Sequence, residues 1–269
     1  MRNLLGPTLR LGVSAAAVSL LAASRWRPDD VKVLAEQPLA TPGIAAVGAA
    51  LHALLEGQDV ANRAVSVVLA DELCRLWQVV PPPQAARLAD IEAAAALRFH
   101  ALYGEAPGAW QLTADWHAKE PFFAAAVPRV LLAAIGQVAN DARLHVVQVV
   151  PHFVTAWNRW CRAIRPGAWF GQLHDNLLTV AAIDGGRLCA VRALQVPHGA
   201  DHYWLTQMLQ REALLLGLAL PERLQLCGAV PAALQKGAGE GQVPVLRLDA
   251  GQGDALSAAS RLAFAGSTP

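Results

Sequence analysis

Residues 9–24 read LRLGVSAAAVSLLAAS, and this stretch decides the fold of the chain. Apolar residues alternate from Leu9 to Val13, which is the period of a β-strand and allows Arg10 to point outward. The small tract at residues 14–17 suits a turn, and the apolar residues after it form a returning strand. The stretch therefore predicts a buried β-hairpin, to which residues 31–39 add a third strand.

The same stretch also supports a different interpretation. Arginines at positions 2 and 10 precede the apolar residues 11–23, which end in Ala22-Ala23-Ser24. A basic start, a short apolar run and small residues are typical of a secretory signal peptide. An exported protein that loses about its first 23 residues is thus an alternative. We favour the hairpin because a similar pair of strands recurs in the second half of the chain.

That second meander spans residues 168–197. Two apolar strands meet at His174-Asp175-Asn176, and Asp184-Gly185-Gly186 is a signal for a tight hairpin turn. Helices are expected at residues 44–55, 89–103, 128–138, 151–164, 201–216 and 254–264, and further strands at 64–69, 73–80, 145–150, 224–227 and 243–248. The pattern predicts a two-lobed α/β fold with mixed sheets flanked by helices. Residues 1–150 would form the first lobe and residues 151–269 the second.

Composition narrows the possible functions. The chain has 269 residues, of which 54% are hydrophobic and 16% charged, enough for a large core. A net charge of +1 gives no electrostatic reason to expect nucleic acid as a partner. The four cysteines are far apart and form no C-x-x-C motif, so we expect buried, reduced thiols and a cytoplasmic location.

Three stretches with small residues follow expected strands. The first is Gly12-Val13-Ser14-Ala15-Ala16, the second contains Gly171 and Asp175, and the third is Gly228-Ala229. Together with the order of elements, they resemble the actin-like ATPase superfamily, which has a ribonuclease H-like fold. Within it the chain looks most like the PilM family of type IV pilus assembly and the cytoplasmic domain of the GspL family of type II secretion.

The resemblance implies a nucleotide cleft between the lobes, with phosphates at the two hairpins and the base at the third stretch. It assigns Gly12, Ser14, Gly171, Asp175 and Gly228 to a remnant of that cleft. The family's first phosphate loop reads roughly Gly-x-Asp-x-Gly, but here Ser14 replaces the carboxylate and Ala16 the second glycine. Gly171 and Asp175 match the second loop only in a shifted register, and the third stretch has one glycine instead of a pair.

These departures weaken the groups that catalysis would need. Glycines let backbone N–H groups approach phosphate, and Mg²⁺ requires oxygen ligands such as carboxylates. We therefore expect no catalysis, no metal and no cofactor. An ATP-binding enzyme, either an ATPase or a phosphotransferase, is the alternative.

As for partners, the resemblance implies a non-catalytic scaffold at the cytoplasmic face of the inner membrane. Such a scaffold would bind a cytoplasmic segment of a membrane protein, with an exposed sheet edge as one possible mode. A homodimer is also possible.

Two further groups of residues are candidates for binding. His198 and His202 are four residues apart, but Gly199 places them at a loop-to-helix junction, where solvated side chains are expected rather than metal ligands. Trp157 and Trp160 fit the apolar face of a helix. Three other tryptophans lie in expected turns and are candidates for a partner groove: Trp26, Trp110 and Trp116.

Overall fold

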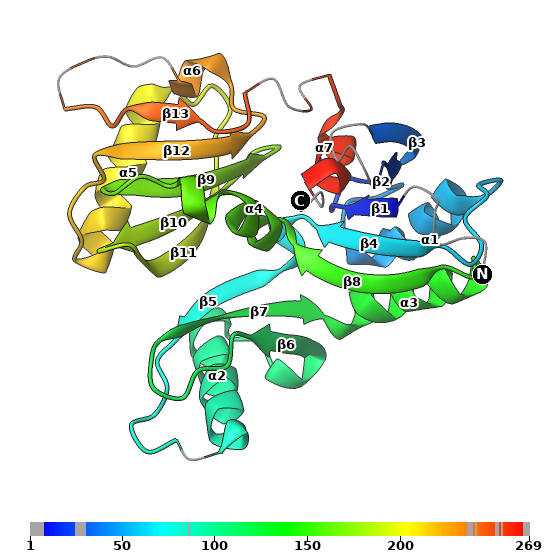
Figure 1. The fold of residues 1–269 in the computed structure, drawn as a ribbon, viewed down its shortest axis with the longest axis horizontal. Coiled ribbons are helices and arrows are strands. Elements are labelled where there is room, and N and C mark those ends of the chain that lie inside the picture. The colour runs from blue at the N-terminus through cyan, green and yellow to red at the C-terminus, as the bar shows by residue number, and fades with distance from the viewer. Residues whose placement is uncertain are drawn as a thin grey trace.

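The computed structural model describes residues 8–24, 31–85, 87–235, 239, 241–250, 253 and 255–265 of the chain. In this part of the protein, strands form two five-stranded sheets and one three-stranded sheet, with helices packed against them (Figure 1). The predicted α/β class with mixed sheets flanked by helices is confirmed.

The first sheet has the predicted hairpin at its centre. Its strand order is β3-β2-β1-β4-β8; β1, β2 and β3 are antiparallel neighbours, whereas β4 and β8 run parallel to β1. The strands are β1 (Thr8–Val13), β2 (Ala17–Ala23), β3 (Val31–Pro38), β4 (Ala64–Leu69) and β8 (His145–Pro151). The residues that the export alternative assigns to a signal peptide thus include two inner strands of this sheet.

The second sheet repeats this topology. Its order is β11-β10-β9-β12-β13, again with an antiparallel meander followed by two parallel strands. The strands are β9 (Ala168–His174), β10 (Leu177–Asp184), β11 (Arg187–Gln195), β12 (Arg223–Gly228) and β13 (Val245–Arg247). Gly185 and Gly186 both have positive φ, as a tight hairpin turn requires. The prediction of two sheets built on the same plan is confirmed.

The third sheet was not foreseen as such. Its order is β5-β7-β6, and all pairs are antiparallel: β5 (Arg75–Val79), β6 (Trp110–Ala114) and β7 (Phe122–Pro128). The helix α2 (Leu88–Tyr103) packs against it through Ile91, Ala95 and Phe99. The sequence pattern missed β6 and β7, because the alanines of β7 carry little of the β-branched or aromatic signal by which strands are recognised.

This sheet changes the interpretation of the tryptophans. Trp110 is buried rather than in a turn, with its ring centroid 5.5 Å from that of Phe99. Trp116 is half-buried, and its ring centroid is 5.8 Å from that of Phe122. Trp26 lies outside the described residues. Trp110 is therefore a core anchor, and the prediction of a partner groove at this position is wrong.

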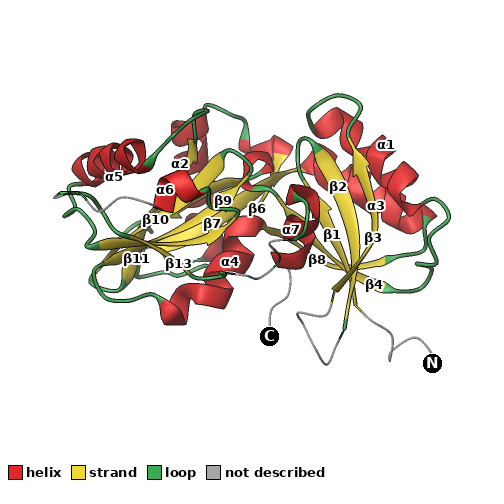
Figure 2. Ribbon diagram, turned by 90° about the horizontal axis from the view of Figure 1, so that it is seen from above, coloured by secondary structure: helices red, strands yellow, loops and turns green. Residues whose placement is uncertain are grey.

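Helices cover both main sheets. The helices α1 (Ile44–Leu55) and α3 (Arg129–Asp141) pack on one face of the first sheet, and α5 (His202–Leu216) packs on one face of the second (Figure 2). The carboxylate of Asp201 accepts the Trp204 N–H and starts α5, and Gly217 ends it in the left-handed conformation, both as predicted. The shorter helices are α6 (Ala232–Gln235), η2 (Asp71–Leu73), η3 (Pro107–Ala109) and η4 (Cys161–Ala163).

Two helices cross between the lobes. The helix α4 (His152–Trp160) directly follows β8 of the first sheet, yet its Phe153 packs on Phe170 of the second sheet. The helix α7 (Ala258–Ala265) follows the second sheet, yet it lies against β1 and β2 of the first (Figures 1 and 2). Its Ala263 packs on Leu21. The division of the chain after residue 150 remains a prediction, and the final helix lies against the lobe on the other side of that boundary.

The position of α7 explains why Arg10 of β1 is buried. Arg10 alternates away from its apolar neighbours as predicted, but α7 covers it, so that it is 7% exposed instead of facing solvent. Its Nη1 donates a hydrogen bond to the Phe264 carbonyl oxygen at 3.5 Å, near the end of α7. Burial, together with the charge of Arg159, lowers the pKa of Arg10 to about 10.

Several smaller expectations differ from the structure. The strand β8 was expected to be buried, but it is an outer strand and Val147 is 62% exposed. Asp254, the expected cap of the last helix, lies outside the described residues. The Ser257 hydroxyl accepts the Ser260 N–H at this end of α7. All four cysteines are free as predicted, but Cys161 and Cys189 are only half-buried.

The contact between β1 and α7 can be tested at Gly12. A Cβ atom there would lie 2.8 Å from both the Ala259 oxygen and the Ala263 nitrogen, which are backbone atoms that cannot rotate away. We expect Gly12→Ala to lower the free energy of unfolding by about 1–3 kcal/mol, measured by urea denaturation. In the matched control Gly48→Ala, within α1, the nearest atom is 3.8 Å away, and a gain of about 0.5–1 kcal/mol is expected. A Gly12→Ala protein as stable as the unmodified one would show that α7 does not pack tightly here.

Candidate functional site

The turn between β1 and β2 is where the resemblance places a phosphate loop. Ser14 is buried, and its hydroxyl donates to the Ala17 carbonyl and accepts the N–H groups of Ala16 and Ala17 at 3.2 and 3.0 Å. The Ala15 N–H donates to a carboxylate oxygen of Glu72 at 2.6 Å. The N–H groups that a phosphate would need are therefore bonded within the chain, and Glu72 occupies the place of an anion.

Two of the predicted glycines have packing roles. Gly12 lies against the backbone of α7, as described above. Gly171 is in the middle of β9, and a Cβ atom there would lie 2.3 Å from a methyl group of Leu226. Both glycines permit close approach of neighbouring elements, which accounts for their presence without a ligand.

The turn between β9 and β10 contains the predicted acidic residue. Asp175 has φ of 50°, the left-handed conformation that aspartate tolerates better than most residues. One of its carboxylate oxygens is 3.7 Å from Nε2 of His174. Gly171 lies earlier, within β9, so the structure does not bring the two residues together in one loop.

Gly228 ends β12 and must be glycine. Its φ is 100°, and a Cβ atom would lie 2.0 Å from the Leu173 carbonyl oxygen. Its N–H donates to a carboxylate oxygen of Asp249 at 2.7 Å, and the other oxygen of that carboxylate accepts from Arg247. The backbone donor at the expected base-binding turn is thus also bonded within the chain.

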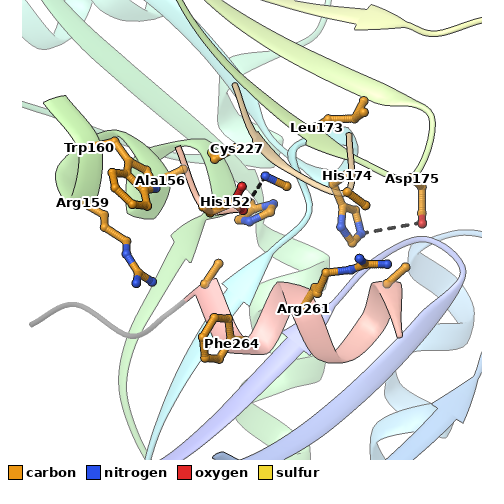
Figure 3. Close-up of a pocket in the computed structure, with 15 residues that line it drawn as sticks. His152, Ala156, Arg159, Trp160, Leu173, His174, Asp175, Cys227, Arg261 and Phe264 are labelled. Carbon is orange, nitrogen blue, oxygen red and sulfur yellow. Dashed lines mark hydrogen bonds and ion pairs between the residues drawn. The ribbon is translucent and has the colours of Figure 1, made fainter. Parts of the chain in front are cut away.

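Asp175 and Gly228 line one cavity between the lobes, together with Arg261 and Phe264 of α7 (Figure 3). Gly12, Ser14 and Gly171 do not line it. The cavity has a volume of about 60 Å³. Pockets that hold drug-sized ligands have volumes of roughly 300–1,000 Å³, so this one has room for water molecules but not for a nucleotide.

Two histidines also face this cavity (Figure 3). His152 and His174 are each 6% exposed, and their ring centroids are 5.5 Å apart in an edge-to-face arrangement. Burial lowers the pKa of both histidines. The neighbouring His174 lowers the pKa of His152 further, whereas Asp175 and Glu72 oppose the lowering at His174. His152 Nδ1 and His174 Nε2 have no hydrogen-bond partner in the described part of the protein, which fits neutral imidazoles bridged by water.

The residue that joins the lobes most directly is Asp71, which sequence reasoning missed. It is 6% exposed and follows the end of β4. One carboxylate oxygen accepts the Phe153 N–H at the start of α4, and the other accepts the Thr179 hydroxyl of β10, both at 2.9 Å. Burial raises the pKa of Asp71 to about 6, although both hydrogen bonds oppose this shift.

Asp71 and Glu72 together connect three elements. Glu72 contacts the β1–β2 turn, and Asp71 contacts α4 and the second sheet. In the implied nucleotide cleft, phosphates would lie between the two hairpins. Here the carboxylate of Glu72 contacts the turn of the first hairpin, and that of Asp71 contacts β10, a strand of the second hairpin. The available sequence signal was an acidic pair after the carboxyl end of a buried parallel strand, where functional side chains gather in α/β folds.

No metal site was found. Among the described residues, no group of three or more His, Cys, Asp or Glu side chains is placed to hold a metal ion. His198 is exposed as expected, whereas His202 is 3% exposed, so the prediction of a solvated side chain is wrong for His202. Within the described ranges, no helix combines the length and the apolar character that crossing a bilayer requires.

The two matched sheets, the crossing helices and the cleft between the hairpins define the actin-like ATPase fold. No protein-family model and no curated protein sequence matches the chain. Among solved structures, a protein of unknown function with this fold from Bacteroides thetaiotaomicron has a TM-score of 0.65 at 10% identity, covering 98% of this chain and 97% of that one.

Two further solved structures are similar to the chain over most of its length. One is the cytoplasmic domain of EpsL, an inner-membrane component of the type II secretion system of Vibrio cholerae, with a TM-score of 0.60 at 17% identity, covering 97% of this chain and 96% of that one. The other is the PilM–PilN complex of type IV pilus biogenesis, with a TM-score of 0.56 at 17% identity, covering 97% and 86%. The predicted fold, that of the actin-like ATPases, is confirmed.

The buried carboxylate of Asp71 gives a test by pH. Its pKa is about 6 when folded and 3.8 ordinarily, so the folded state takes up a proton first as pH falls. Stability from this group therefore rises as pH falls through 6 toward 4, by about 2 kcal/mol between pH 7.5 and 4.5. Asp71→Asn keeps the shape and cannot titrate. The quantity to measure is the unfolding free energy of the unmodified protein minus that of Asp71→Asn, by urea denaturation at both pH values. We expect this difference to be larger at pH 4.5 than at pH 7.5 by about 2 kcal/mol. A constant or falling difference would contradict the buried position of Asp71.

Proposed function

We propose that the protein is a non-catalytic scaffold in an inner-membrane assembly of the pilus or type II secretion kind. It works in the cytoplasm, associates with the membrane through its partners, and holds a cytoplasmic segment of a membrane protein. The likeness to the EpsL cytoplasmic domain and to PilM in complex with PilN supports this setting.

The observation that carries the proposal is the state of the cleft. The N–H groups of the first hairpin turn and of the Gly228 turn are bonded to Ser14, Glu72 and Asp249. The cavity that Asp175 and Gly228 line is about 60 Å³. A nucleotide would have to displace internal hydrogen bonds and move α7 before it could bind there. A carboxylate of the chain itself, that of Asp71, instead bonds across the two lobes, as a scaffold that needs no nucleotide requires.

A groove near α4 is the candidate binding surface. It has a volume of about 250 Å³ and lies between the third sheet, α4 and β11. Its apolar lining includes Leu76, Phe123, Phe153 and Val191, and the half-buried Trp157. Large, rigid aromatic side chains in a shallow apolar groove are typical anchors for a bound peptide.

An open strand edge adjoins this groove. The strand β6 is the outer strand of the third sheet, with β7 on one side and no hydrogen-bonded strand on the other among the described residues. Thr113 and Asp115, at the end of β6, line the groove. An extended partner segment can therefore pair with the β6 backbone and place side chains against Trp157, which is recognition by strand addition.

The absence of nucleotide binding can be measured by thermal shift. A ligand present at about 100 times its Kd stabilises the folded state by about 2.7 kcal/mol, which raises the melting temperature by several degrees. We expect Mg-ATP to produce no shift beyond that of Mg²⁺ alone. A shift that grows with ATP concentration and disappears in Asp175→Ala would establish a working cleft and favour the enzyme alternative.

The groove is tested with peptides that cover the cytoplasmic segments of single-span membrane proteins encoded beside this gene. We expect one of them to bind, as measured by fluorescence anisotropy. Thr113 is exposed and lines the groove, so Thr113→Arg should weaken binding at least tenfold by filling it. Gln111→Arg, on the same strand but outside the groove, is the matched control and should leave affinity within twofold. Equal losses in both variants, or no binding by any segment, would count against the proposal.

A further inference from the structure

A second groove lies where the third sheet meets the second lobe. It has a volume of about 410 Å³, and β5, α2, β11 and the end of α5 contribute to it. The residues that determine its character are Trp77, Val80, Arg98, Leu102, Arg192 and Leu216.

This groove adjoins the groove at Trp157. Val191 of β11 lines both of them. Leu76 and Leu188 line the groove at Trp157, and their chain neighbours Trp77 and Cys189 line the second groove. The two grooves are therefore neighbours at the junction of β5 and β11.

The apolar part of the second groove is exposed. Val80 is 70% exposed and Leu102 is 40% exposed, and Leu216 is half-buried beside them. Single exposed apolar side chains are common on protein surfaces, but here they gather around one concave site. Burial of these side chains by a partner would be favourable.

The charged groups of the groove all have one sign. Arg98 is exposed and makes no ion pair in the part of the chain that the structure describes. The Nε atom of Arg192 is 3.6 Å from a carboxylate oxygen of the buried Glu212. No Asp or Glu is among the residues that line the groove. The Trp77 Nε1–H, in a residue that is 2% exposed, has no acceptor among the described residues. A buried donor without an acceptor is unfavourable and indicates a missing ligand atom or water.

From this combination we propose that the second groove binds an acidic, amphipathic segment of a further partner protein. A carboxylate of the segment pairs with Arg98, and its apolar residues cover Val80 and Leu102. The proposal does not depend on the scaffold function, because it rests on the lining of this groove alone. If both proposals hold, the protein binds two different partners at neighbouring grooves of one junction.

The charge preference is tested with two fluorescein-labelled amphipathic peptides of leucine and glutamate, identical except that lysine replaces glutamate in the second. We expect the full chain to bind the acidic peptide at least tenfold more tightly than the basic one. Arg98→Glu should weaken acidic-peptide binding at least tenfold. Arg211→Glu reverses an exposed charge on α5 outside the groove and should leave it within twofold. Equal affinity for the two peptides would overturn the proposal.

The apolar contact has its own matched pair. Val80 and Val130 are 70% and 68% exposed, and only Val80 lines the groove. Val80→Asp should weaken the acidic peptide at least tenfold, and Val130→Asp less than twofold. The proposal fails if Arg98→Glu abolishes binding to phosphatidylglycerol vesicles but not to the peptide, which would assign the groove to lipid. It also fails if this variant only converts a dimer to a monomer in sedimentation, which would assign the groove to a second copy of the chain.

Discussion

The crossing of α4 and α7 between the two sheets is the constraint on which the rest of the structure depends. The helix α4 directly follows the last strand of the first sheet and packs on the second, and α7 follows the second sheet and packs on the first. Gly12 allows the backbone of α7 to lie directly on β1. Arg261 and Phe264 of α7 also form part of the wall of the small cavity at Asp175 and Gly228.

The carboxylates of Asp71 and Glu72 at this junction accept hydrogen bonds from within the chain. Asp71 receives an N–H from α4 and a hydroxyl from the second sheet, and Glu72 receives an N–H from the first hairpin. A buried carboxylate is unfavourable unless its hydrogen-bonding capacity is used, so the two bonds of Asp71 favour one relative position of the lobes. In an ATPase of this fold a bound nucleotide would connect the two hairpins. Here two consecutive carboxylates of the chain itself contact both hairpins.

The sequence was a good guide where periodicity was strong and a weak one elsewhere. Alternation in residues 9–24 and the turn at Gly185 predicted both meanders, because strand burial and glycine conformation are local effects. The alanine-rich strand β7 was missed because small residues give little contrast. The site was predicted least well: Asp175 and Gly228 do share a cavity, but Gly12 and Gly171 serve packing, and Asp71 acts through contacts with residues more than 80 positions away. Such long-range contacts leave no local pattern.

The exchange of helices also has a consequence for biosynthesis. The first sheet is complete by residue 151, yet α7, which covers Leu21 and Arg10 on one of its faces, is made only at residues 258–265. A nascent chain must therefore carry an uncovered apolar surface on its first lobe while the ribosome makes about a hundred further residues. During translation the early lobe remains a folding intermediate, open to chaperones and to unwanted association, until the last helix emerges and closes it.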